Sequence, residues 1–324
     1  MEGLQTTWGW LIAVYLFLGG LGAGAFVAGA MVSLTTGERF KSTVRFAAWT
    51  SAIAIALGVL MLLIHAGKPF RALVMFNSFD NLNSWMAIGA WLLLGAILFN
   101  GLFALFWTDK VLNWVGARWK FPVEKRKVFR VILAVLGIFI NLGVAVYTGV
   151  LLGVLPFRPL WNTWWLPALF TASALDTGVG IVTGYATLGE RAEGAKKLRI
   201  GLEVFIIALI LIEGAVLYLY LSNMLKAGGE VVRSVELLTQ GALSIPFWVM
   251  VVGMGLGIPL LICITQLAGL LKKKAAFFVP LFGLLSCLIG GWTLRYLVLS
   301  AGFPQSLSSP AFSQVLDGVR WFIK

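Results

Sequence analysis

Metal-binding side chains are scarce in this chain of 324 residues, which has one histidine and two cysteines. A membrane b-type haem held by two imidazoles would need a second histidine, and an iron–sulfur cluster needs about four cysteine thiolates. Cys263 and Cys287 lie in apolar runs without a CxxC spacing, so we interpret them as small packing residues. We therefore expect no haem, no iron–sulfur cluster and no metal site in this chain.

Charged residues are scarce as well, at 12% of the sequence, whereas hydrophobic residues make up 60% and the mean hydropathy is +0.94. A soluble domain usually carries about 25% charged residues. Half that share leaves too little polar surface to cover a water-soluble globule of 35.2 kDa. The composition therefore excludes a soluble globular enzyme and predicts a membrane protein with several spans.

Eight apolar runs are long enough to cross a bilayer as helices, which takes about 20 mostly apolar residues. Runs such as 53–64 and 204–212 do not alternate between apolar and polar residues, as the strands of a membrane barrel would. The sequence therefore predicts an all-α integral membrane protein that forms one domain over residues 1–324. The expected helices cover residues 8–35, 44–66, 84–108, 127–152, 165–188, 199–222, 243–271 and 276–299.

The basic residues are distributed unequally between the two sides of these spans. Seventeen of the 25 Lys and Arg residues lie in or beside the loops after spans one, three, five and seven, and seven lie in the opposite loops and the tail. Cytoplasmic loops are enriched in Lys and Arg, so we expect both termini to be extracytoplasmic. The net charge of +12 then reflects topology and contact with the lipid bilayer, and we expect no binding of nucleic acid.

Small-residue segments in the first and fifth spans, residues 18–24 and 173–180, have a weakly similar pattern. Both spans run from outside to inside, so the similarity indicates two four-helix bundles in parallel orientation. Such segments also recur by chance in membrane helices. The glycines of 19–24 lack a phosphate-loop pattern, and we expect them to permit close helix packing, with a flat pocket wall as the alternative.

Ionisable residues inside a span are costly and therefore mark candidate functional sites. Asp176 and Glu213 lie deep in the fifth and sixth spans, and Arg295 lies about one turn inside the outer end of the last. Two interpretations stay open: a structural ion pair or hydrogen-bonded carboxyl, and a buried path for protons. Glu203 lies nearer a helix end, where we expect contact with water.

One histidine and two tyrosines mark the outer edge of the apolar layer. His65 ends the second span, while Tyr15 and Tyr147 lie at similar depth in the first and fourth spans. Each phenol offers a hydroxyl, and an imidazole titrates near neutrality. A quinone has a lipid tail, carbonyl groups and a need for two protons on reduction, so it suits this set of groups. A solvated helix end is the alternative for His65.

The first five spans carry three sets of motifs: the tryptophans, Tyr15 and glycines of 8–24, the segment 65–91 with its Ser-Trp-Met-Ala helix start, and the Tyr-Thr-Gly and Arg-Pro-Leu-Trp-Asn motifs of 147–175. Together these motifs resemble the NrfD and polysulfide reductase family of membrane subunits. The resemblance covers the order and spacing of these five spans and is weak over the last three.

This resemblance implies a haem-free anchor that binds menaquinone or ubiquinone near the outer face of a bacterial or archaeal cytoplasmic membrane. The anchor would pass electrons between the quinone pool and an extracytoplasmic, ferredoxin-like iron–sulfur subunit with four clusters. That partner would serve a catalytic subunit with a molybdenum or tungsten pterin cofactor. Two alternatives remain: a proton-coupled secondary transporter that uses Asp176, Glu213 and Arg295, and a structural anchor that has lost its quinone site.

The resemblance also assigns roles to residues around the expected quinone. Tyr147 matches the family's tyrosine at the quinone, and we expect His65 to bind the other carbonyl, although many members have aspartate before the end of this helix. Tyr15 falls where relatives place a polar or aromatic pocket group. Further pocket residues are Gly20 and Gly67, with Lys68 and Arg71 facing either the reduced head group or lipid phosphates.

The outer loops are where the resemblance places the docking surface for the iron–sulfur partner. The residues expected there are Asp80, Arg158, Trp161 and Asn162. The alternative interpretation is an ordered outer loop without a partner.

Overall fold

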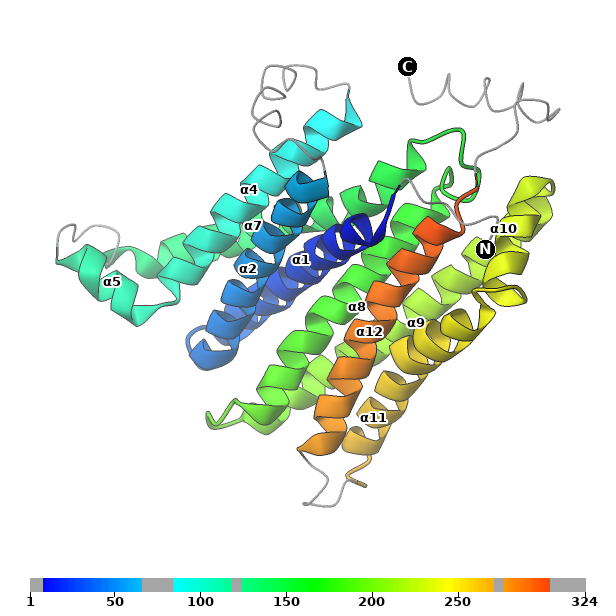
Figure 1. Cartoon of the computed structure of the whole chain (residues 1–324). Helices are drawn as coiled ribbons and strands as arrows, with labels where there is room; N and C mark the ends of the chain where they lie inside the picture. The colour runs from blue at the N-terminus through cyan, green and yellow to red at the C-terminus, as the bar shows by residue number, and fades with distance from the viewer. Residues whose placement is uncertain (1–7, 66–83, 118–123, 271–276, 304–324) are drawn as a thin grey trace.

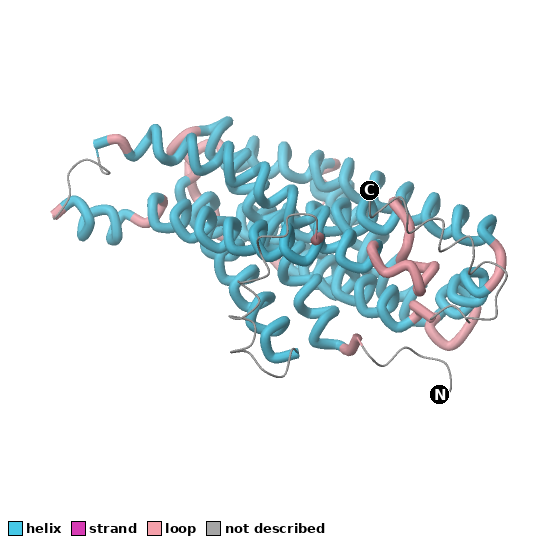
Figure 2. The backbone as a smooth tube through the Cα atoms, turned by 90° about the horizontal axis from the view of Figure 1, so that it is seen from above, coloured by secondary structure: helices cyan, strands magenta, loops and turns pink. Residues whose placement is uncertain are grey.

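The computed structural model of the chain describes residues 8–65, 84–117, 124–270 and 277–303. These residues form helices joined by short connections, and no strand occurs among them (Figures 1 and 2). Within the described ranges, eight helical segments are long and apolar enough to cross a membrane. They are α1 (Trp10–Thr36), α2 (Lys41–His65), α4 (Trp85–Phe106), α7 (Arg126–Gly153), α8 (Trp165–Leu188), α9 (Ala195–Ala227), η2 (Pro246–Gly257) continuing into α11 (Ile258–Leu267), and α12 (Phe278–Ser300).

The predicted all-α membrane fold and its eight spans are thereby confirmed, with helix ends that differ by a few residues. The seventh span begins as the π-helix η2 and becomes the α-helix α11 next to Pro259, which has no N–H for the helical ladder. Two short helices outside the spans, α5 (Asp109–Gly116) and α10 (Glu230–Thr239), were not expected from the sequence.

The spans form two four-helix bundles. In the first, α1, α2, α4 and α7 pack in a ring, and in the second, α8 and α9 pack with the η2–α11 span and α12. The bundles meet through α1 and α8, which lie side by side at the centre of the molecule (Figure 1). The two expected bundles are therefore present, and their central helices are the two that carry the small-residue segments.

Close approach of α1 and α8 depends on glycine. A Cβ atom built on Gly24 would lie 2.1 Å from the carbonyl oxygen of Ala174, and one built on Gly178 would lie 2.3 Å from the backbone of Gly24. Backbones can approach this closely only when the facing residues are small. The expected role of the glycine-rich segment in helix packing is confirmed.

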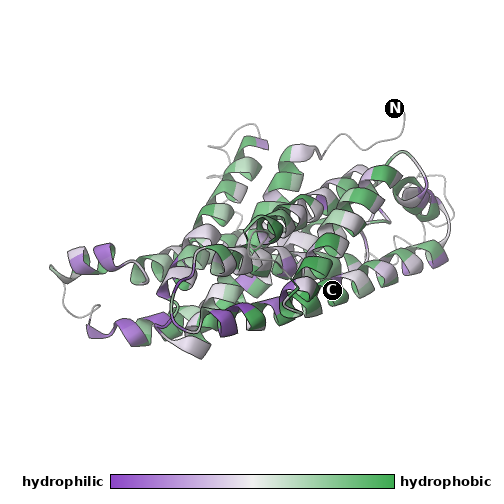
Figure 3. Cartoon of the chain, turned by 90° about the horizontal axis from the view of Figure 1, so that it is seen from below, coloured by the Kyte–Doolittle hydropathy of each residue, from purple (hydrophilic) through white to green (hydrophobic). Residues whose placement is uncertain are grey.

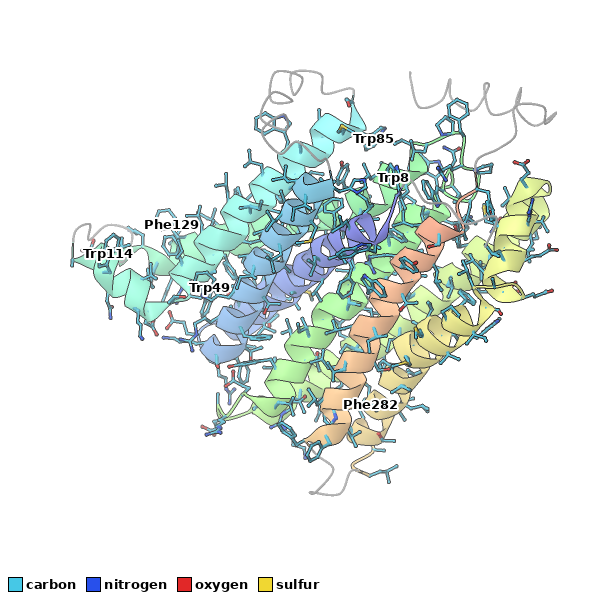
Figure 4. All side chains as sticks on the ribbon, in the orientation of Figure 1. Trp8, Trp49, Trp85, Trp114, Phe129 and Phe282 are labelled. Atoms are coloured by element: carbon cyan, nitrogen blue, oxygen red, sulfur yellow. The ribbon has the colours of Figure 1, made fainter. Side chains whose placement is uncertain are left out.

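The outer surface of the bundles is apolar, as a lipid-facing surface should be. Trp49 of α2 and Phe282 of α12, both labelled in Figure 4, are 38% and 52% exposed. Hydrophilic residues gather towards the helix ends (Figure 3). Water and lipid therefore meet different parts of the same helices, which supports a multi-pass membrane protein.

One end of the molecule collects the start of α1, the α7–α8 connection and the end of α12. The rings of Trp8 and Trp161 lie 5.6 Å apart, and the indole N–H of Trp161 donates to the carbonyl of Val298 at 2.8 Å. The opposite end holds the α1–α2, α4–α5 and α8–α9 connections, which belong to the predicted basic side. The assignment of these ends to the outside and inside of a cell stays a prediction.

Candidate functional site

Tyr15 and Tyr147 are brought together inside the first bundle. Both are buried, with exposed fractions of 1% and 5%, and both belong to the same cluster of buried residues where α1 packs against α7. The Tyr147 ring lies against Gly89 of α4, where an added Cβ would fall 1.7 Å from the ring carbon Cζ. Because Gly89 has no side chain, it leaves the space that the phenol ring of Tyr147 occupies. The sequence analysis did not assign this role to Gly89.

The Tyr15 hydroxyl is buried and has no hydrogen-bond partner among the described residues. Leaving a buried polar group unpaired costs about 1–3 kcal/mol, so such a group calls for a partner such as water or a ligand. The hydroxyl of Tyr220, which is equally buried, donates to the carbonyl of Leu160 at 2.8 Å. The Tyr15 hydroxyl is therefore free to bind an acceptor such as a ligand carbonyl, and the pair of phenols fits a quinone head group chemically.

The remaining residues expected around the quinone are not all joined to this pair. His65 is the last residue of α2 and is exposed, and no hydrogen bond links it to either tyrosine in the described part of the chain. Gly20 faces α8 and α12, where an added Cβ would lie 2.8 Å from the Arg295 guanidinium. Gly67, Lys68 and Arg71 lie outside the described residues, as does Asp80 from the expected docking surface.

A second candidate site is a buried polar cluster where the second bundle meets α1. Asp176 and Ser173 come from α8, Glu213 from α9, and Cys287 and Arg295 from α12. The Arg295 guanidinium, which is fully buried, donates to the Ser173 hydroxyl at 3.2 Å and to the carbonyl of Gly291 at 2.6 Å. The Cys287 thiol donates to Asp176 at 3.4 Å. The structure thus joins Arg295 to Ser173 and Asp176 to Cys287 by hydrogen bonds across α8 and α12, and Glu213 is buried on the neighbouring helix α9.

Several atoms of this cluster lack partners among the described residues. They are the nitrogens Nε and Nη2 of Arg295 and the oxygen Oδ1 of Asp176. Among the same residues, no carboxylate oxygen lies within the 4 Å ion-pair distance of Arg295. Instead, the rings of Phe17 and Phe170 have their centroids 5.7 and 5.4 Å from its Cζ. The described residues therefore show no ion pair between Arg295 and a carboxylate. Two N–H donors of Arg295 and one acceptor oxygen of Asp176 remain free to bind water.

Two members of the cluster, Ser173 and Cys287, escaped the sequence analysis. Ser173 precedes Asp176 by three positions, and Cys287, Gly291 and Arg295 follow one another at intervals of four. Residues at these spacings share one helix face, so helical spacing could have identified them. Glu203 differs from expectation in another way, since it is buried at 4% exposure rather than solvated.

A small hollow of about 40 Å³ lies beside this cluster, between α8, α9, α11 and α12. Cys287 lines it at one end, and Thr183, Thr187 and Gln266 line it towards the basic side. A water molecule needs about 10–15 Å³ of such space and two or more polar partners. The hollow can therefore hold a few waters next to the thiol that contacts Asp176.

The loop between α7 and α8 is ordered by contacts within itself and with the end of α12. Arg158 donates to the carbonyl of Gly302 and stacks over the ring of Trp161, and Asn162 donates to the carbonyl of Gly153 at 2.7 Å. Trp161 is fully buried, and partial burial lowers the pKa of the Arg158 guanidinium. These contacts match the alternative of an ordered outer loop, while docking of a partner there stays a prediction.

Comparison with known proteins identifies relatives over nearly the whole sequence. A family model described as polysulphide reductase, NrfD, matches residues 2–305. A polysulfide reductase chain of Wolinella succinogenes is 29% identical over 307 residues, which cover 91% of this chain and 94% of that protein. Protein NrfD of Escherichia coli is 25% identical over the same shares of the two proteins. A selenate reductase subunit of Mesobacillus selenatarsenatis is 27% identical over 59% of this chain and 50% of its own length.

Proposed function

The chain belongs to the polysulphide reductase, NrfD family, and from this premise we propose that it is the quinone-binding membrane anchor of a respiratory oxidoreductase. It exchanges electrons between menaquinone or ubiquinone and an extracytoplasmic iron–sulfur protein with four clusters. That protein is the link to a catalytic subunit with a molybdenum or tungsten pterin cofactor. The names of the relatives support a part in a reductase of several subunits, because one is a chain of polysulfide reductase and another is a subunit of selenate reductase.

The unpaired, buried hydroxyl of Tyr15, in the same buried cluster as Tyr147, is the observation that carries this proposal. In our proposal, the two phenols donate hydrogen bonds to the carbonyl groups of the quinone, which is the substrate. A donor at a carbonyl oxygen stabilises the negative charge that develops there on reduction. His65, exposed at the end of α2, can exchange protons with water and pass them to the head group.

The buried cluster around Arg295 supports a second part of the proposal, a path for protons. Asp176, Glu213 and Arg295 together bring acidic and basic groups to the centre of the molecule, next to a hollow that can hold water. A proton-coupled secondary transporter would use the same three residues. Isolation of the chain together with a cysteine-rich iron–sulfur protein would favour the anchor, whereas solute uptake by the chain alone would favour the transporter.

Conservative changes to the two phenols test the quinone site. In the isolated complex, Tyr147→Phe and Tyr15→Phe should each lower quinone-linked turnover about fivefold to tenfold, since each removes a hydrogen bond worth about 1–1.4 kcal/mol. His65→Ala should also lower it. Activity of the catalytic subunit with a soluble dye should not change, because the dye bypasses the quinone.

Tyr220→Phe is the matched control for these variants. It removes a buried hydroxyl that already has a partner, the carbonyl of Leu160, so it should cost about 1 kcal/mol of stability and leave quinone turnover unchanged. Tyr15→Phe removes a buried hydroxyl without a partner and should therefore raise thermal stability in the absence of quinone. Normal quinone turnover in both Tyr15→Phe and Tyr147→Phe would rule out our assignment of the site.

A further inference from the structure

A groove of about 530 Å³ opens on the basic side of the molecule, between the end of α1 and the start of α9. The helix α8 packs against both of these helices. The deeper part of the groove is apolar, and its walls are formed by Ala28, Met31, Val32, Leu202 and Phe205. Positions 28 to 36 of α1 span roughly 12 Å at about 1.5 Å per residue, so the groove runs along the helices into the membrane.

Two cations, Arg39 and Lys197, line the mouth of this groove, and both are exposed. None of the residues that line it is acidic. Arg39 is held in place by a hydrogen bond from its Nε to the carbonyl of Glu193 at 3.0 Å. A side chain on Gly194, whose φ is +81°, would meet the Arg39 guanidinium at 2.7 Å, so glycine leaves the space that Arg39 occupies.

The start of α9 adds to the positive potential at the mouth. Its N-cap, Gly194, makes no side-chain capping bond, and the N-terminal end of a helix carries a partial positive charge. A positive mouth above apolar walls is complementary to a molecule with an anionic head and a hydrocarbon tail. A neutral quinone carbonyl would gain less from the two cations than an anionic phosphate does, and a free phosphate would gain nothing from the apolar walls.

We propose that this groove is a binding site for an anionic phospholipid of the basic leaflet. The phosphate lies between Arg39 and Lys197, and one acyl chain lies along the apolar walls of α1 and α9. Because α1 belongs to the first bundle and α9 to the second, the bound lipid joins the two bundles on the side opposite the tyrosine pair. The site is thus separate from the proposed quinone site and does not depend on it.

Native mass spectrometry of the full-length protein tests the head-group half of this site. The protein is released from vesicles of equal parts phosphatidylglycerol and phosphatidylethanolamine, and retained lipids are counted. The wild type should retain phosphatidylglycerol preferentially. The variant with both Arg39→Gln and Lys197→Gln should bind it about 30-fold more weakly, which corresponds to about 2 kcal/mol. A control with Lys110→Gln and Lys127→Gln removes two exposed charges from the same side and should bind as the wild type does.

Filling the groove tests the acyl-chain half without a change of charge. A Cβ on Gly201 meets no atom within 4 Å, and Gly201 lines the groove, so Gly201→Trp should occupy it and expel the retained lipid. Gly101 of α4 has the same open space but lies elsewhere, so Gly101→Trp is the matched control and should retain lipid.

Three results would overturn the proposal. One is equal retention of the two phospholipids by the wild type, and another is equal loss from both double variants. The third is loss of a bound isoprenoid quinone, rather than phosphatidylglycerol, from Gly201→Trp, which would identify the occupant as quinone. Thermal unfolding of each variant in detergent shows whether it is folded, and a misfolded Gly201→Trp would be replaced by Gly201→Leu.

Discussion

At the scale of single residues, Glu38 shows how one carboxylate can organise the basic side. It lies in the turn between α1 and α2, 3.1 Å from Lys41, and it also pairs with the largely buried Arg130 of α7. Partial burial alone would raise the pKa of Glu38, but the hydrogen bond from Lys41 and the charges of Arg130 and Arg126 lower it below its ordinary value. The ionised form is therefore favoured in the folded protein.

Glu38→Gln should destabilise the folded protein at neutral pH by about 1–2 kcal/mol, because it leaves Arg130 without its anion. A carboxyl with a lowered pKa contributes stability above its ordinary pKa of about 4.3, and this contribution is lost as the pH falls through the lowered value. The difference in Tm between wild type and variant should therefore be present at pH 7 and shrink below about pH 4. A difference that grows on acidification would contradict this account.

At the scale of helices, contact between α1 and α8 holds the two bundles together. The closest approach is at Gly24, where the two backbones leave no space for a side chain. A helix pair in a membrane gains its stability from close packing rather than from exclusion of water. The junction between bundles is therefore sensitive to the addition of a single methyl group.

Gly24→Ala should lower the free energy of unfolding by about 1–3 kcal/mol, because the new Cβ would overlap the carbonyl of Ala174 and force the helices apart. Gly101→Ala adds the same methyl group at a helical position with open space and should stabilise the protein by about 0.4–1 kcal/mol. Thermal unfolding in detergent measures both. If the two variants changed the free energy of unfolding by the same amount and in the same direction, the junction between α1 and α8 would be less tightly packed than described.

At the scale of the whole molecule, the distribution of basic residues sets the orientation. The ends of α1, α4, α8 and α11 lie on the side where the sequence places most Lys and Arg residues, and this side should face the cytoplasm. The proposed quinone site and the start of α1 then face outward. The proposed lipid groove faces inward, where anionic lipids attract basic residues.

A reporter enzyme that needs disulfides to fold tests this orientation, because disulfides persist only outside the cytoplasm. Fused after Lys324, the reporter should be active, and inserted in the α8–α9 connection near Glu193, it should be inactive. A reporter that fluoresces only in the cytoplasm should give the opposite pattern. Activity near Glu193 would reverse the orientation and place the tyrosine pair at the cytoplasmic end.

The sequence by itself determined the membrane class, the eight spans and the basic side. These follow from the local cost of placing polar groups in hydrocarbon, which each segment meets independently of its neighbours. It also identified the charged members of the Arg295 cluster, since any charge within a span is conspicuous. Gly89 is different, because a lone glycine has no pattern of its own in an apolar helix.

Only the tertiary structure decided which side chains meet. It placed Tyr15 and Tyr147 in one buried cluster and left the Tyr15 hydroxyl unpaired, it turned Gly20 towards Arg295, and it buried Trp161 in an ordered loop. The physical reason is that the rotation of each helix about its axis depends on packing against several others at once. Glycine contacts between α1 and α8 set that rotation, and no single segment contains the information.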